Sequence, residues 1–120
     1  SIGAQVKGAL KSLAREHLAQ ASDHYAQRLG HSYQGLRLRD TRSRWGSCSS
    51  DGHLMYSWRL VMAPRDVLNY VAAHEVAHLV EMNHSKSFWA VVQHIYGDYE
   101  QPRDWLRKSG NQLHRYDFNS

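Results

Sequence analysis

Cysteine and proline are scarce in this chain of 120 residues, which contains one cysteine and two prolines. A single thiol, Cys48, excludes an internal disulfide and fits a reducing compartment. No stretch approaches the roughly 18 apolar residues that a membrane span needs. Residues 1–10 also lack the charged start and long apolar block of a secretory leader. We therefore expect a cytoplasmic protein with no membrane association.

The overall composition is that of a globular protein. Hydrophobic residues make up 42% of the chain and charged residues 22%, which excludes a disordered or low-complexity sequence. A chain of this length suits one domain, and its core needs neither disulfides nor oligomerisation to be stable. We predict a single domain over residues 1–120 and a monomer.

Positive charge is concentrated in the middle third of the chain. The net charge is +4, and residues 28–64 alone hold six arginines against two aspartates, a local balance of 6 − 2 = +4. Arginine is suited to bidentate contacts with phosphate or carboxylate groups. Alternating arginines can equally be the solvated face of a sheet. If they bind substrate, the candidates are Arg42, Arg44 and Arg59.

Hydrophobic periodicity predicts one long helix followed by a small sheet. Apolar residues recur at three- and four-residue steps over residues 5–29, and Gly30 is a suitable helix terminator. Residues 36–39 then alternate as in a half-buried strand. Two further short strands, 44–48 and 53–58, flank turn-forming residues 49–52 and predict a hairpin. On strand 53–58 we expect Leu54, Tyr56 and Trp58 to share one face.

Three more helices are expected after the sheet. The first covers residues 64–82, with Pro64 at its first position and Asn83 at its end. Ser85 can cap the next helix, which Gly97 ends, and a last short helix covers residues 102–110. The order predicts an α+β fold with an N-terminal helix, a small antiparallel sheet and C-terminal helices.

The second predicted helix contains the pattern H-E-x-x-H, formed by His74, Glu75 and His78. Two histidines four residues apart project from one helical face, so both imidazoles can reach one zinc ion. Glu75 lies one step further round the helix, where a general base for a zinc-bound water belongs. The alternative is two histidines packed on a helix face beside a solvated glutamate.

A third histidine favours the metal site. Catalytic zinc usually has three protein ligands and one open position, and His84 follows His78 by six residues. On a continuous helix His84 would lie about 9 Å further along and roughly 120° away, out of reach. The helix must therefore break between them, and Asn83 and Ser85 supply a stop and a restart.

The same ligand spacing occurs in metzincins, whose pattern is H-E-x-x-H-x-x-G-x-x-H followed by a methionine turn. This chain has Glu81 where that pattern needs glycine. Its three methionines, Met55, Met62 and Met82, all precede the last histidine. The metzincin interpretation fails on both counts.

Several segments over about residues 36–110 are similar to one family of small metallopeptidases. They read RWGSCS at 44–49, WRLVMAP at 58–64, HEVAHL at 74–79, MNHS at 82–85, FW at 88–89, and a tail with Tyr99, Trp105 and Leu106. This set resembles the YgjP-like group of zincin-like metallopeptidases and, more distantly, the SprT-like proteases. The resemblance implies one Zn²⁺ per chain, held by His74, His78 and His84, with Glu75 as base. It also implies a three-stranded sheet whose edge strand borders the cleft.

This chain departs from that group in two places: the region before the sheet and the connection between His78 and His84. The region before the sheet is shorter than is usual there, which leaves open that an N-terminal portion is missing from this sequence. Only five residues separate His78 from His84, where larger relatives have a longer connection, so we expect an open cleft.

Three functions follow, in order of preference. The first is a zinc metallopeptidase acting on a peptide or protein. The second is a nucleoside triphosphate (UTP) pyrophosphatase, described for some YgjP-like proteins, with the arginines on the polyphosphate; the lack of a glycine-rich phosphate loop counts against it. The third is a SprT-like DNA-associated protease or DNA-binding module, for which a net charge of +4 is modest. Tyr56, Tyr96 and Tyr99 could stabilise a developing oxyanion, and the spacing selects none of them.

Overall fold

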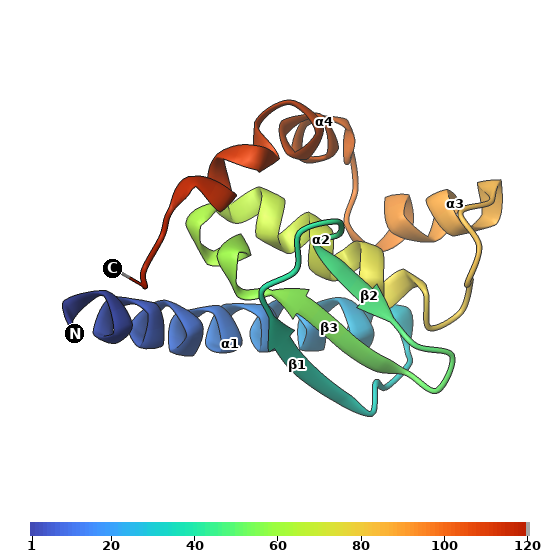
Figure 1. Cartoon of the computed structure of the whole chain (residues 1–120). Coiled ribbons are helices and arrows are strands. Elements are labelled where there is room, and N and C mark those ends of the chain that lie inside the picture. The colour runs from blue at the N-terminus through green and yellow to red at the C-terminus, as the bar shows by residue number, and fades with distance from the viewer. Residues whose placement is uncertain (120) are drawn as a thin grey trace.

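A small sheet packs against helices in residues 1–119, the part of the chain that the computed structural model describes (Figure 1). The elements in chain order are α1 (Ile2–Leu29), β1 (Gly35–Arg39), β2 (Gly46–Cys48), β3 (His53–Ser57), the 3-10 helix η1 (Trp58–Met62), α2 (Arg65–Ala77), α3 (Lys86–Ile95), α4 (Glu100–Ser109) and the 3-10 helix η2 (Gly110–Arg115). The predicted α+β fold is confirmed. None of the helices in these residues combines the length and apolar character needed to cross a membrane.

Helix α1 begins and ends with local capping interactions. The Ser1 hydroxyl accepts a hydrogen bond from the backbone N–H of Ala4, and Gly30 ends the helix with a φ of 80°. A left-handed conformation of this kind favours glycine, so Gly30 terminates the helix as predicted. The buried face of α1 starts at Ala14, whereas Val6 and Leu13 are exposed.

The sheet is mixed, so the prediction of an antiparallel three-stranded sheet was wrong. The strand order is β1-β3-β2; β3 pairs antiparallel with β2, as the hairpin predicted, and parallel with β1. The chain leaves β1 opposite Ser57 and enters β2 opposite Tyr56, so residues 40–45 cross the end of β3. This leaves β2 as one edge of the sheet.

The central place of β3 follows from its side chains. Leu54, Met55, Tyr56 and Ser57 are all buried, so both faces of this strand are covered and the expected alternation of buried and exposed residues is lost. Strand β3 ends at Ser57, whose hydroxyl accepts a hydrogen bond from the N–H of Arg59. Trp58, predicted in the strand, instead begins η1.

The C-terminal helices are the three predicted ones with shifted bounds: Pro64 is the N-terminal cap of α2 rather than its first residue, and the largest shift is at the end of α2. This helix stops at Ala77 with His78 as its C-terminal cap, five residues before the predicted end at residue 82. Ser85 caps α3 by accepting a hydrogen bond from the N–H of Phe88, as predicted. Helix α4 begins at Glu100, two residues before the expected start.

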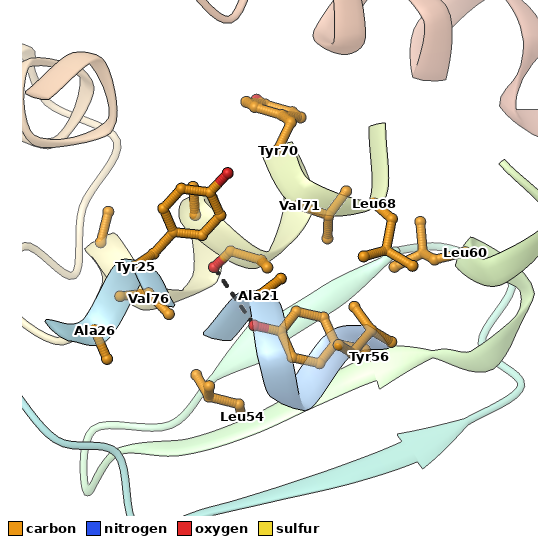
Figure 2. Close-up of a cluster of buried hydrophobic side chains, with 14 of the residues drawn as sticks. Ala21, Tyr25, Ala26, Leu54, Tyr56, Leu60, Leu68, Tyr70, Val71 and Val76 are labelled. Atoms are coloured by element: carbon orange, nitrogen blue, oxygen red, sulfur yellow. Dashed lines mark hydrogen bonds between the residues drawn. The ribbon is translucent and has the colours of Figure 1, made fainter. Parts of the chain in front are cut away.

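Helices α1 and α2 pack against each other and against the sheet to form the core (Figure 2). Tyr56 is fully buried within it. Its hydroxyl lies 2.9 Å from the Ser22 hydroxyl of α1 and donates to the carbonyl oxygen of Ala72 on α2 at 3.4 Å. The Tyr56 hydroxyl therefore ties β3 to both helices inside the core.

We expect Tyr56→Phe to lower the free energy of unfolding by about 1–3 kcal/mol, because it leaves the buried Ser22 hydroxyl without its partner. Chemical denaturation measures the change. The matched control is Tyr116→Phe, since Tyr116 is exposed and should leave stability unchanged. Equal stability of Tyr56→Phe and the unaltered protein would contradict the assigned role of this hydrogen bond.

Candidate metal centre

The early end of α2 places the two histidines of the H-E-x-x-H pattern in different settings. His74 lies in the last turn of α2, and His78 caps the helix with its backbone N–H on the carbonyl oxygens of Glu75 and Val76. The ring of His78 also bonds to the backbone: Nδ1 donates to the carbonyl oxygen of Glu81 at 2.9 Å. Since a carbonyl only accepts, Nδ1 carries the proton and Nε2 is left with a free lone pair.

Residues 79–85 return the chain so that His84 joins the other two. One ring nitrogen from each of His74, His78 and His84 lies within 4.8 Å of the others, and the Nε2 atoms of His78 and His84 are 3.2 Å apart. Two ligands held tetrahedrally at 2.0–2.1 Å from zinc are about 3.3 Å apart. The His78–His84 pair has this spacing, and with a nitrogen of His74 within 4.8 Å of both the donor set has the chemistry of a three-histidine metal site.

Aromatic side chains of α3 support these rings. Phe88 is fully buried, and its ring stacks on His78 with 4.5 Å between centroids and packs edge-on against His74 and His84. Burial lowers the pKa of His84, and the neighbouring His74 and His78 lower it further. Both effects favour the neutral imidazole, which is the form that binds a metal.

Glu75 is buried beside the histidines and is 5% exposed. Its Oε2 accepts a hydrogen bond from Nδ1 of His74 at 3.2 Å. Across the cleft, Gly46 of β2 approaches so closely that an added Cβ would lie 2.9 Å from Cγ of Glu75 and 3.1 Å from the backbone oxygen of Met55. Only glycine fits at this position without displacing the glutamate or the sheet.

An open cleft of about 440 Å³ lies between β2 and α2 and contains the three histidines and Glu75. The other residues that line it are Arg44, Trp45, Gly46, Ser47, Cys48, Tyr70, Val71, Met82 and Leu106. Burial raises the pKa of the Cys48 thiol to about 11, and the nearby Glu75 and Asp51 carboxylates add to this. Burial likewise raises the pKa of Tyr70 to about 12, partly opposed by the charge of Arg103.

Comparison with known proteins matches this chain to a family. The family described as YgjP-like, metallopeptidase domain, matches residues 1–109 of the chain. The chain belongs to the YgjP-like metallopeptidase domain family. No curated protein matches it.

Among solved structures, the YgjP-like fold is similar to the crystal structure of the metallopeptidase zymogen of Pyrococcus abyssi abylysin. The two chains are 20% identical, and the TM-score is 0.67 over 82% of this chain and 96% of that one. At this identity the likeness concerns the fold. Membership of the family makes this chain a metallopeptidase-type, metal-dependent hydrolase domain.

The three candidate arginines of this YgjP-like domain are in different places. Arg44 lines the cleft, whereas Arg42 contacts Nδ1 of His114 at 3.1 Å outside it. Arg59 is buried and 4% exposed; it pairs with Asp40 and donates to the carbonyl oxygens of Leu113 and Tyr116. Of these three arginines, only Arg44 lies at the cleft, and Arg59 instead binds the C-terminal segment inside the protein.

The sequence did not predict a place in the cleft for two residues, Gly46 and Tyr70. Gly46 was noted only as part of a family motif, because its contact with Glu75 joins positions 29 residues apart and leaves no local signal. Tyr70 did have a local signal, since it precedes His74 by four residues and so shares its helical face. The open cleft expected from the short connection between His78 and His84 is present.

We expect Gly46→Ala to lower the free energy of unfolding by about 1–3 kcal/mol, since the new methyl group overlaps Glu75 and the backbone of β3. Chemical denaturation measures this. Gly8→Ala is the control, because an added Cβ there meets nothing within 4 Å and alanine favours a helix interior. If Gly46→Ala were as stable as the unaltered protein, the close approach to Glu75 would be incorrect.

The Asp40–Arg59 pair predicts a pH-dependent contribution to stability. The hydrogen bond from Arg59 lowers the pKa of Asp40 from its usual 3.8, so the contribution is complete above about pH 4 and disappears as the pH falls through the folded-state pKa. We expect Asp40→Asn to be less stable than the unaltered protein at pH 7, by a margin that shrinks toward pH 2–3. Denaturation at several pH values measures the margin.

The control is Asp98→Asn, which removes an exposed carboxylate that forms no ion pair within residues 1–119 and whose hydrogen bond from the N–H of Glu100 an asparagine oxygen can also accept. It should cost little at any of these pH values. A destabilisation by Asp40→Asn that stays constant from pH 7 to pH 2 would contradict the assignment of the pair.

Proposed function

We propose that this domain is a zinc-dependent metallopeptidase with one Zn²⁺ held by His74, His78 and His84. The observation that carries the proposal is the convergence of three imidazole nitrogens within 4.8 Å beside a buried glutamate in an open cleft. Family membership supports peptide bonds as the target. A neutral three-histidine set also suits zinc better than magnesium, which prefers oxygen ligands.

Glu75 is the proposed general base. A zinc ion in this site would supply Lewis-acid chemistry, polarising a peptide carbonyl and making a water more acidic. The Glu75 carboxylate would take the proton of the attacking water and pass it to the leaving amine. Its contacts with His74 and Gly46 hold it at the cleft wall in a fixed position, which this double transfer requires.

The substrate we propose is an extended segment of peptide that lies along β2. Within residues 1–119 this strand is paired only with β3, so its other side is available to add a strand by backbone hydrogen bonding. Residues 46–48 of β2 line the cleft next to Glu75. A peptide in that register would bring one of its carbonyl groups to the histidine cluster.

The nucleotide alternative keeps only part of its physical basis. It required several arginines on a polyphosphate, and of the three candidates only Arg44 lines the cleft; Arg59 already makes four hydrogen bonds elsewhere. The DNA-binding alternative has no observation in its favour. We therefore keep both as arms of the test, and the monomeric state and cytoplasmic location remain predictions.

Two variants separate metal binding from chemistry. Glu75→Gln should retain one zinc per chain and cleave peptides about 10²- to 10⁴-fold more slowly, because it keeps the shape but cannot take a proton. His84→Ala should lose zinc as well as activity, since it removes a ligand. Metal analysis and cleavage of a panel of unstructured proteins, with and without a chelator, measure both.

Matched controls are Glu16→Gln and His94→Ala, which alter exposed residues on α1 and α3 and should change neither readout. The same preparations are incubated with nucleoside triphosphates and titrated with single-stranded DNA. Absence of zinc from the unaltered protein, or nucleotide turnover that depends on Arg44 while peptides stay intact, would overturn the proposal.

A further inference from the structure

Tyr70 is a buried tyrosine at the wall of the cleft with no role assigned so far. It lies one helical turn before His74 on α2, and its side chain is 4% exposed. Its ring packs edge-on against His74, with 6.0 Å between centroids, and against Tyr96, and it stacks on Tyr99. These contacts and the burial of the side chain restrict the movement of the ring. Figure 2 shows it at the margin of the core cluster, turned away from Tyr56 and Leu54.

The hydroxyl of Tyr70 has no hydrogen-bond partner among residues 1–119, which distinguishes it from neighbouring tyrosines. The Tyr56 hydroxyl bonds within the core, and the Tyr96 hydroxyl donates to the carbonyl oxygen of Asp66 at 3.0 Å. In the same residues the one fully buried side-chain polar atom without a partner is Nε1 of Trp58, so the Tyr70 hydroxyl keeps some exposure to solvent, and Tyr70 is one of the residues that line the cleft.

A donor of this kind is suited to catalysis. An oxyanion hole needs a hydrogen-bond donor that is already oriented and has no other partner in the protein. Such a donor does not have to turn or break another hydrogen bond in the transition state. Tyr70 meets both conditions, and it lines the same cleft as His74 and Glu75. Of the other tyrosines considered, Tyr56 and Tyr96 have partners, and Tyr99 is not among the residues that line the cleft.

We propose that the Tyr70 hydroxyl donates a hydrogen bond to the oxyanion that develops on the scissile carbonyl oxygen, so that Tyr70 is a catalytic residue. The inference rests on the proposed peptidase function. Tyr70 keeps its proton throughout: it stabilises the negative charge when the water oxygen bonds to the carbonyl carbon. The hydrogen bond to the oxyanion ends when the carbonyl re-forms and the bond to the leaving amine breaks. Glu75 carries out the proton transfers.

The test is Tyr70→Phe, which keeps the ring and removes only the hydroxyl. We expect kcat to fall by about 10²- to 10³-fold, as for other lost oxyanion donors, with KM nearly unchanged. Zinc content and melting temperature should stay as in the unaltered protein, because the hydroxyl forms no hydrogen bond within residues 1–119. The matched control is Tyr96→Phe, whose ring packs against Tyr70 but whose hydroxyl bonds to Asp66; its kcat should be close to normal.

A second readout does not depend on turnover. A peptide phosphonamidate has a tetrahedral anionic group that resembles the transition state. Its Kd, measured by calorimetry, should rise about 10- to 100-fold in Tyr70→Phe, the range for a lost hydrogen bond to a charged group. The Kd of an ordinary product peptide should change little. Loss of zinc or of folding in Tyr70→Phe, or equal weakening of both ligands, would contradict the donor role.

Failure of this inference is distinguishable from failure of the proposed function. If the unaltered protein cleaves peptides, Glu75→Gln does not, and Tyr70→Phe matches the unaltered protein, only the role of Tyr70 is wrong. If the unaltered zinc-containing protein cleaves no peptide and binds no phosphonamidate, the peptidase proposal and the role of Tyr70 are both overturned.

Discussion

The end of α2 at Ala77 is the constraint on which the site depends. If the helix continued to residue 82, His84 would be carried along the axis and away from the face that presents His74 and His78. Instead the His78 ring donates to the backbone of Glu81, which holds the turn and leaves Nε2 of the same ring facing His84. One hydrogen bond thus sets both the path of the chain and the protonation of a ring nitrogen. Ser85 then starts α3 and brings Phe88 beneath the cluster.

Sequence reasoning succeeded where the relevant distances along the chain are short. The spacing of His74, His78 and His84 required a helix break, and the structure has one and brings the three rings together. The predicted end at Asn83 was too late, because the termination depends on the His78 contact rather than on a left-handed residue; within residues 1–119 only glycines have a positive φ. The metal itself remains a prediction.

Contacts between residues far apart in the sequence were harder to predict. The order β1-β3-β2 depends on β3 being covered on both faces, and a five-residue strand does not reveal how many neighbours it has. The arginines show a related limit, since counting charge cannot distinguish the exposed Arg42 from the buried Arg59. Likewise the glycine at position 46 was visible, but its reason, the proximity of Glu75, exists only after the strand meets the helix.

The cleft wall opposite α2 is held from outside the sheet. Strand β2 spans only three residues and, within residues 1–119, pairs with β3 alone, so few ladder hydrogen bonds fix Gly46 against Glu75. Additional support comes from Trp45, whose carbonyl oxygen accepts the N–H of Ser57 and whose ring stacks on His114 at 5.0 Å. His114 belongs to η2.

The C-terminal segment that contains η2 is itself tied to the rest of the domain by Arg59 of η1. This buried guanidinium donates to the backbone oxygens of Leu113 and Tyr116 on one side and to Asp40, in the segment between β1 and β2, on the other. An arginine that the sequence placed among the substrate contacts therefore joins the end of the chain to the loop that leads into the edge strand. The ion pair thus supports the loop that leads into the cleft wall, and Gly46 in that wall lies against the proposed base, Glu75.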